Sequence, residues 1–487
     1  MKSLKEILYK VAIEAVKGST EVNINKIDFD SRKIASGDAF VAIRGALANG
    51  HDYIETAVNN GAVAVICDVF PKNIQPDVTY ILVKDTNAAL AFMASNYYDN
   101  PSQNLKLVGI TGTNGKTTIA SLLFQLFKKA GYKVGLLSTV KNVVDEVEYK
   151  SLLTTSDSLT INKFLREMND VGVEYCFMEV SSHGVAQKRT EGLQFAGGVF
   201  TNLSHDHLDY HKTFAEYRDV KKSFFDHLPK NAFALVNIDD KNGLVMLQNT
   251  QAKKLTYALK TYSDYKAQIL ENQLSGLLMK INGQEVWVRL IGTFNAYNLL
   301  AIFGTAVQLG LEEIEVLRLL SELESVSGRF QFIISEGNIT AIVDYAHTPD
   351  ALENVLNTIN DIRTKNEQLI SIVGCGGDRD KTKRPLMANI ASTLSDKAIL
   401  TSDNPRTENP ETIIEEMEKG VEAQNYKKTL SIIDRKQAIK TACQLANSGD
   451  IILIAGKGHE TYQEINGVRH DFDDMKIVTQ ILQQLNK

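Results

Sequence analysis

The segment Gly-Ile-Thr-Gly-Thr-Asn-Gly-Lys-Thr-Thr at residues 109–118 is the feature that most limits how this chain can fold. An apolar run, 105–110, precedes it, and a helix-like stretch, 119–129, follows it. A strand, a glycine-rich turn and a helix in this order form a cradle for phosphate. The glycines let backbone N–H groups turn inward, and the helix N-terminus carries partial positive charge. The segment therefore predicts a nucleoside triphosphate site.

The side chains of this segment have distinct expected roles. Gly112 and Gly115 free the backbone to turn, Lys116 reaches the terminal phosphates, and Thr117 ligates Mg²⁺. The strict P-loop pattern requires glycine where Ile110 stands, so the alternative is an ordinary turn with a chance Gly-Lys-Thr. The strand before the segment and the helix after it favour the phosphate site.

Composition limits the class of protein. A chain of 487 residues exceeds one hydrophobic core, so several domains are expected. A net charge of −6 and the absence of a long basic run argue against nucleic acid as a partner. We expect no signal peptide and no membrane span, since no apolar run approaches ~20 residues. Four scattered cysteines suit buried thiols in a reducing cytoplasm.

Turn-rich stretches at 98–103 and 325–329 divide the chain into three blocks. The second and third blocks alternate apolar strands with amphipathic helices, which is typical of α/β domains with mostly parallel sheets. The expected strands are 39–43, 62–67, 80–83, 105–110, 134–137, 175–180, 198–201, 233–237, 341–343, 369–373, 397–401 and 451–455.

Glu179 lies at the end of the expected strand 175–180. Ligands of α/β proteins bind beside the carboxyl ends of parallel strands, so Glu179 is placed to hold Mg²⁺ on a triphosphate. A surface glutamate at a strand end is the alternative. The phosphate loop in the same sheet favours the magnesium role.

A dense polar cluster over residues 201–211 contains three histidines and two aspartates. This composition suggests zinc first, because Mg²⁺ prefers oxygen ligands, and a polar surface loop is the alternative. Lys221 follows in a helix that begins near residue 217, and spacing alone makes it a solvated salt-bridge partner. Asn295 and Asn298 precede an apolar helix and share a face that suits contacts to a base or ribose. An N-cap is an equally good interpretation of Asn295.

Three loops of the last block follow expected strands and carry Arg379, Arg406 and Glu460. In a parallel sheet such loops converge at one edge. Two guanidinium groups beside a carboxylate describe a site for an anionic group next to an ammonium group. An amino acid is the simplest ligand of that kind.

Together these motifs resemble those of the Mur ligases, the ATP-dependent amino-acid-adding enzymes of peptidoglycan synthesis. The resemblance covers essentially the whole chain. It implies an α/β fold of three domains: a UDP-sugar-binding domain (1–101), a central P-loop ATPase with a parallel sheet (102–331) and a C-terminal Rossmann-like amino-acid-binding domain (332–487). The segments that carry it are 109–118, 154–155, 179–183, 202–211, 292–298, 344–349, 374–384, 403–406 and 456–460.

The resemblance also assigns residues to substrates, and it makes Lys116, Lys221 and His207 the catalytic candidates. ATP contacts fall on Gly112, Thr113, Asn114, Gly115, Lys116, Thr117 and Thr118, with Asn295, Arg329 and Asp344 toward adenosine. Mg²⁺ ligands fall on Thr117, Glu179, His207 and a CO₂-derived carbamate on Lys221. Nucleotide-sugar contacts fall on Ser31, Thr154, Thr155, Ser181, Gln187 and Arg189. Amino-acid contacts fall on Arg379, Asp403, Asn404, Pro405, Arg406, Gly456 and Glu460.

The implied reaction joins meso-2,6-diaminopimelate to UDP-MurNAc-L-Ala-D-Glu through an acyl phosphate, at the expense of ATP, in a cytoplasmic and monomeric enzyme of cell-wall precursor synthesis. The intact sequence Asp403-Asn404-Pro405-Arg406 marks the diaminopimelate-adding branch. The alternatives are the lysine-adding branch, a folylpolyglutamate-synthetase-like ligase, and a P-loop switch or kinase without ligase chemistry. His205 or His347 remain open as the base that deprotonates the attacking amine.

Overall fold

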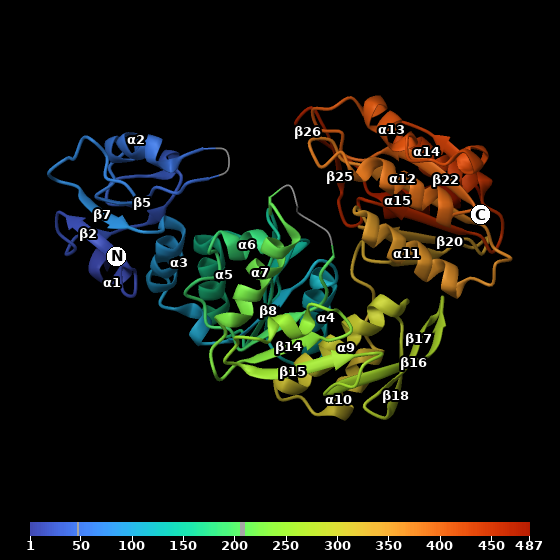
Figure 1. Ribbon diagram of the computed structural model, residues 1–487, viewed down its shortest axis with the longest axis horizontal. Helices are drawn as coiled ribbons and strands as arrows, with labels where there is room; N and C mark the ends of the chain where they lie inside the picture. The colour runs from blue at the N-terminus through green and yellow to red at the C-terminus, as the bar shows by residue number, and fades with distance from the viewer. Residues whose placement is uncertain (46–47, 205–209) are drawn as a thin grey trace.

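The computed structural model describes residues 1–45, 48–204 and 210–487, and it contains three α/β domains in chain order (Figure 1). The N-terminal domain lies at one end, the C-terminal domain at the other, and the large central domain between them. Helix α3 of the N-terminal domain packs against α5 of the central domain, which joins the first two domains. These helices span Thr86–Tyr97 and Ser158–Asp170.

The N-terminal domain is built on a sheet of order β2-β7-β6-β5-β4. Its strands pair in parallel except for β2, which is antiparallel to β7. The bounds are β2 Ile13–Lys17, β4 Ile27–Asp28, β5 Ala39–Val41, β6 Ala64–Cys67 and β7 Thr79–Val83, with helices α1 Leu4–Ile7 and α2 Ile54–Asn59 and the short pair β1 Lys2–Ser3 and β3 Asn23–Ile24.

The central domain holds a sheet of order β11-β10-β9-β12-β8-β13-β14-β15-β16-β17-β18. The strands from β9 to β16 in this order are parallel, and antiparallel strands extend both edges. The bounds are β8 Lys106–Thr111, β9 Val134–Leu137, β10 Lys141–Val144, β11 Val147–Lys150, β12 Tyr175–Glu179, β13 Gly197–Phe200, β14 Phe233–Asn237, β15 Lys253–Ala258, β16 Tyr265–Gln273, β17 Gly276–Ile281 and β18 Gln284–Val288.

Helices cover both faces of the parallel part of this sheet. Side chains of α4 and α9 form one buried core with α10, and side chains of α5 and α7 form a second core on the opposite face. This doubly wound arrangement leaves the carboxyl ends of the strands as the ligand-binding edge. The helices are α4 Lys116–Lys129, α6 Ser182–Ala186, α7 Phe214–Asp226, α8 Gly243–Met246, α9 Thr293–Gln308 and α10 Glu313–Ser321.

The C-terminal domain has a sheet of order β19-β20-β24-β21-β22-β23, parallel except for β19. Helices α11, α12 and α13 cover one face, and α14 and α15 cover the other. The bounds are β19 Gln331–Ile334, β20 Thr340–Asp344, α11 Pro349–Ile362, β21 Leu369–Cys375, α12 Lys383–Leu394, β22 Lys397–Ser402, α13 Pro410–Glu418, β23 Thr429–Ser431, α14 Arg435–Leu445, β24 Ile451–Ala455, β25 Tyr462–Ile465, β26 Val468–Asp471 and α15 Asp474–Gln484.

Every expected strand overlaps an observed one, and the three-domain α/β fold is confirmed. The antiparallel strands β10, β11, β17, β18 and β19 were not expected from the sequence, nor was β16, which is parallel to β15 and antiparallel to β17. The parallel strands β4, β15 and β23 were also not expected. The four cysteines are free, buried thiols, as expected. None of the helices in the part of the chain that the structure describes is both long and apolar enough to cross a bilayer.

Candidate active site

The glycine-rich loop after β8 has the conformation that a phosphate cradle needs. Gly112 and Gly115 adopt φ of 147° and 87°, and Gly115 caps α4 at its N-terminus. A Cβ on Gly112 would lie 1.9 Å from Thr201 Oγ1, so a side chain does not fit there. The Thr113 N–H donates to the Asn202 carbonyl at 2.8 Å, which fixes the loop against the segment after β13. Helix α4 therefore directs its N-terminus at the site, as the sequence predicts.

Lys116 and Thr117 begin α4. Lys116 Nζ donates to the carbonyls of Gly112 (2.9 Å) and Thr113 (2.8 Å), so its ammonium group lies over the loop. Thr117 Oγ1 donates to Glu179 Oε2 at 2.9 Å, and the Thr139 N–H donates to the other carboxylate oxygen at 2.7 Å. Glu179 is fully buried, so the alternative of a surface glutamate is wrong. A hydroxyl beside a buried carboxylate is a donor set that fits Mg²⁺.

Lys221 reaches the underside of the same loop from α7. Its side chain is 1% exposed, and Nζ donates to the Gly112 carbonyl at 3.0 Å and lies 4.8 Å from the centre of the Tyr217 ring. The interpretation of Lys221 as a solvated side chain is wrong, because the side chain is buried. His207, His205 and the core of the 201–211 cluster lie outside the described residues. Elsewhere along the chain, in 1–45, 48–204 and 210–487, no group of three or more metal-binding side chains occurs.

A cleft of about 600 Å³ opens between the phosphate loop and the C-terminal domain. Asn114, Gly115 and Thr118 line one wall, and Asn295, Arg329 and Asp344 line the others. Arg329 Nη2 donates to Thr117 Oγ1 at 3.2 Å, which links the interdomain segment to α4. Burial raises the pKa of Asp344, opposed by the charge of Arg329 and by the N–H groups of Phe330 and Ala346. Three of the seven predicted phosphate-loop residues and all three adenosine candidates thus line one space.

Asn295 and Asn298 share a buried helix face, as expected. Asn298 Nδ2 donates to Asn295 Oδ1 at 3.0 Å, and Asn295 Nδ2 donates to the Ile291 carbonyl at 2.8 Å. Helix α9 begins at Thr293 with Gly292 as its N-cap, so the interpretation of Asn295 as an N-cap is wrong. The apolar helix was expected from residue 299, but α9 begins at Thr293. The asparagines before residue 299 continue the helical spacing of its buried face.

Five of the six nucleotide-sugar candidates lie together at the end of β12. Thr155 Oγ1 donates to the Glu179 carbonyl at 2.8 Å and accepts the Ser181 N–H at 2.9 Å. Arg189 donates to the Thr155 carbonyl and to Gln187 Oε1, while Thr154 accepts from Thr139. Ser31 lies apart from them, in the N-terminal domain, where its carbonyl accepts from Asn60 Nδ2 at 2.9 Å. An extended ligand is needed to contact both groups.

A second cleft, of about 590 Å³, lies over the carboxyl ends of β21, β22 and β24. Arg379, Arg406 and Glu460 all line it, so the three loops do converge, and Asp403, Asn404 and Gly456 also line it. Pro405 does not line it. The Pro405 carbonyl instead packs against Gly377, where a Cβ would lie 1.9 Å away.

Lys457 lies behind this cleft, against two of its lining residues, and the sequence reasoning did not select it. It is fully buried, and Nζ lies 3.1 Å from both Asn404 Oδ1 and Glu460 Oε2. Asn404 Nδ2 also donates to Glu460 Oε2 at 2.8 Å, so the three side chains fix one another. Its position between two glycines after β24 was the available signal.

The segment Tyr345–His347 is a wall shared by the two clefts, since both residues line both spaces. His347 Nδ1 lies 2.8 Å from the Tyr345 carbonyl. A carbonyl only accepts, so Nδ1 carries the proton and Nε2 keeps the lone pair in the neutral ring. Burial, with the charges of Arg329 and Lys457, lowers the pKa of the neighbouring His459 to about 3.

A phosphate loop beside a nucleotide cleft that shares a wall with a second, polar cleft, on a three-domain α/β frame, fits the class of ATP-dependent ligases. The sequence agrees with that class. Residues 23–98, 110–306 and 328–458 match three family models, described as Mur ligase family catalytic domain, Mur ligase middle domain and Mur ligase glutamate ligase domain. The chain therefore belongs to the Mur ligase family and is an ATP-dependent, ADP-forming ligase.

Full-length relatives support the same placement. A Cytophaga hutchinsonii protein named UDP-N-acetylmuramoyl-L-alanyl-D-glutamate–2,6-diaminopimelate ligase is 54% identical, over 99% of this chain and 100% of its own. The Bacteroides fragilis protein of the same name is 53% identical, over 98% and 99%. A solved structure of a ligase of that name superimposes with a TM-score of 0.71 at 34% identity, covering 100% of this chain and 99% of that one.

Proposed function

We propose that this enzyme joins meso-2,6-diaminopimelate to UDP-MurNAc-L-Ala-D-Glu with hydrolysis of ATP to ADP and phosphate, as the names of its relatives say of them. The observation that carries the proposal is the cleft in which Arg379, Arg406 and Glu460 meet beside the nucleotide cleft. Diaminopimelate has two amino-acid ends, so two guanidinium groups and a carboxylate match it better than they match lysine.

The chemistry begins with an unreactive carboxylate on the UDP-linked dipeptide. Transfer of the γ-phosphoryl group gives an acyl phosphate, which the amine attacks with release of phosphate. Lys116 and the backbone N–H groups of the phosphate loop position and neutralise the transferring group. Thr117 and Glu179 would hold Mg²⁺, which supplies charge neutralisation at the phosphates. His347, with its Nε2 lone pair, lies between the two clefts and can accept the amine proton.

The decisive experiment measures ADP release with the UDP-dipeptide and a panel of amino acids. We expect kcat/KM for meso-diaminopimelate to exceed that for L-lysine by roughly 10²-fold or more, because lysine leaves a guanidinium unpaired. Comparable values for the two would place the enzyme in the lysine-adding branch. Turnover of a folate in place of the UDP-dipeptide would instead support the folylpolyglutamate-synthetase-like alternative.

We further propose that Lys221 works as a carbamate and, with His207, holds a second Mg²⁺. The supporting observation is that the side chain is buried against the Gly112 carbonyl beside the phosphate loop, whereas a lysine without a role there would extend into solvent. Lys221→Ala should lower kcat by about 10²-fold, and acetate should restore part of it by replacing the missing anion. Lys221→Arg should be inactive without rescue, because a cation remains where an anion is needed. A fully active Lys221→Arg enzyme would contradict the carbamate.

The remaining parts of the proposal concern context. We infer a monomer with domain limits at 1–101, 102–331 and 332–487, and the N-terminal domain with Ser31 takes the UDP end of the substrate. We also infer a cytoplasmic location, where ATP is available and where four free thiols persist. Size-exclusion chromatography with light scattering tests the first inference.

A further inference from the structure

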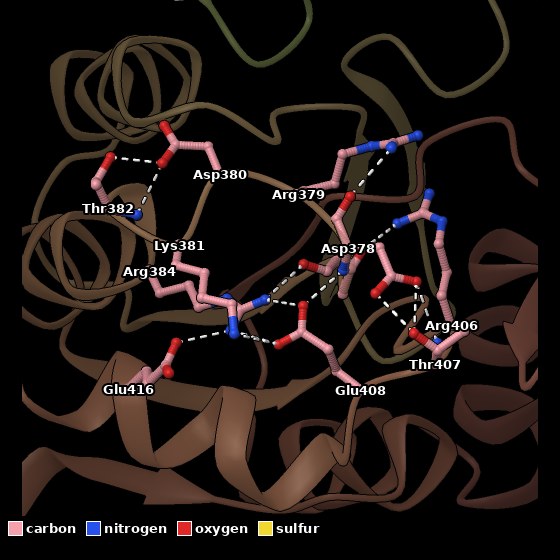
Figure 2. A network of polar contacts seen from close by, with 12 residues as sticks. Asp378, Arg379, Asp380, Lys381, Thr382, Arg384, Arg406, Thr407, Glu408 and Glu416 are labelled. Carbon is pink, nitrogen blue, oxygen red and sulfur yellow. Dashed lines mark hydrogen bonds and ion pairs between the residues drawn. The ribbon is translucent and has the colours of Figure 1, made fainter. Parts of the chain in front are cut away.

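Arg384, near the start of α12, is a fully buried cation whose two terminal nitrogens both bind carboxylates, while its Nε has no hydrogen-bond partner among the residues that the structure describes. Nη1 donates to Glu408 Oε2 at 3.0 Å and to Glu416 Oε2 at 2.7 Å. Nη2 donates to Glu408 Oε1 at 2.9 Å and to the Gly376 carbonyl at 3.3 Å. Glu408 therefore receives the guanidinium fork on both oxygens, which is the strong geometry for this pair (Figure 2).

Glu408 connects two separate loops of the amino-acid cleft. It follows Arg406 in the loop after β22, and its Oε1 accepts the N–H of Asp378, in the loop after β21, at 2.6 Å. Thr407 Oγ1 adds a second tie, donating to Asp378 Oδ1 at 2.8 Å. Hydrogen bonding by Arg384 lowers the pKa of Glu408 to about 2, so the tie stays charged at neutral pH.

The side chains of Arg379 and Arg406 both donate to the backbone of residues 376–378. Arg384 and Glu408 bind the same three-residue stretch. Arg406 Nη1 donates to the Gly377 carbonyl at 2.7 Å, and Arg379 Nη1 donates to the Asp378 carbonyl at 3.2 Å. Figure 2 shows Asp378 between these arginines on one side and the Arg384–Glu408 pair on the other. A shift of the stretch therefore moves both guanidinium groups.

We propose that Arg384 is a positioning residue that sets, through Glu408, the spacing of Arg379 and Arg406 and thereby the selectivity for the incoming amino acid. The proposal rests on the assignment of this cleft to the amino acid. It adds a residue that does not line the cleft itself. A displacement of about 1 Å in a binding group is enough to reduce a reaction rate by roughly 10²-fold.

Glu416 supplies a matched control within the network. It lies on α13 and accepts one hydrogen bond from Arg384, but none of its described hydrogen bonds reaches either loop. Glu408→Gln and Glu416→Gln each remove one negative charge beside the same guanidinium. Only the first should disturb the cleft.

Arg363 supplies a second control. It is a largely buried arginine at the end of α11, paired with Asp396 at the opposite end of the sheet, where β21 begins. Arg363→Met removes another arginine–carboxylate ion pair of this domain, one that is more exposed, without contacting the cleft. It measures how far a general loss of stability alone changes the kinetics.

The kinetic experiment compares wild type with Arg384→Met, Arg384→Lys, Glu408→Gln and the two controls. We expect Arg384→Met and Glu408→Gln to raise KM for meso-diaminopimelate roughly tenfold, with the KM values for ATP and UDP-dipeptide within about twofold of wild type. Arg384→Lys should be intermediate, because an ammonium keeps the charge but lacks the planar pair of N–H groups that Glu408 accepts. The controls should keep the wild-type KM for diaminopimelate.

Amide hydrogen exchange without substrate provides an independent measurement. Glu408→Gln and Arg384→Met should speed exchange over both 376–378 and 404–408, while Glu416→Gln should not. Unchanged exchange in both loops, or an equal rise in all three KM values, would overturn the positioning role. If Arg384→Met fails to fold, Glu408→Gln decides. A wild type that turns over no diaminopimelate but shows the expected exchange would refute the proposed function and leave the loop tie standing.

Discussion

Replacing Lys116 with alanine is expected to lower kcat by about 10²–10⁴-fold with little change in the thermal midpoint. The ammonium group lies over the phosphate loop, where it donates to the carbonyls of Gly112 and Thr113. Its loss removes a charge-assisted contact that is strongest in the transition state of γ-phosphoryl transfer. Steady-state ADP release and a melting curve on the same preparation check the expectation.

Lys128 is the control for this change because it lies on the same helix. It is largely exposed and pairs with Glu146 at 2.8 Å, far along α4 from the loop. Exposed ion pairs contribute at most about 1 kcal/mol, so Lys128→Ala should retain wild-type kcat. A Lys116→Ala enzyme with near-wild-type kcat would remove the phosphate-site assignment.

Replacing Arg406 with alanine is expected to lower kcat/KM for meso-diaminopimelate by roughly 10²–10³-fold, since each lost charged hydrogen bond is worth about 1.5–3 kcal/mol. The residue adopts a left-handed φ of 52°, which directs its side chain toward the cleft loops. One of its donors already serves the Gly377 carbonyl, leaving the rest of the fork for the substrate. The measurement is kcat/KM for diaminopimelate and for L-lysine in parallel.

The contrasting possibility is that Arg406 only braces its loop through Gly377. In that case Arg406→Ala would lower the turnover of both amino acids equally and would also lower the melting temperature. Under the proposal, lysine gains relative to diaminopimelate. Arg406→Lys distinguishes charge from geometry, because it keeps the cation but loses the paired N–H groups.

Most of the parallel strands were predictable because they are buried on both faces and form continuous apolar runs in the sequence, such as Ile451–Ala455. The antiparallel edge strands were not. In β11 every residue is exposed, and in β16 every residue after the first three is exposed or half-buried. Such strands form because they pair with neighbouring strands, and their own composition does not indicate that pairing. Their short polar sequences resemble loops.

The candidate site divides in the same way. Loops at the strand ends that contain Gly, Arg or Glu allowed the phosphate loop and the amino-acid cleft to be predicted, because a parallel sheet brings those ends together. Lys221 and Arg384 gave no such signal, since a lysine or arginine in a helix is usually solvated. Their burial arises from tertiary packing of α7 beneath Gly112 and of α12 beneath Gly376. Helical spacing does not reveal contacts of that kind.

The segment from Tyr345 to Asp350 borders both the nucleotide cleft and the amino-acid cleft. Tyr345 and His347 line both clefts, and Asp350 Oδ2 accepts from Asn114 Nδ2 at 2.9 Å and from Ser204 Oγ at 3.0 Å across the domain border. Thermodynamic reciprocity then applies: whatever factor a bound nucleotide imposes on the affinity for the amino acid, the amino acid imposes on the nucleotide. Each substrate can shift the position of this segment only by the difference in its affinity for the segment's alternative positions. The coupling free energy between the two substrates cannot exceed that difference.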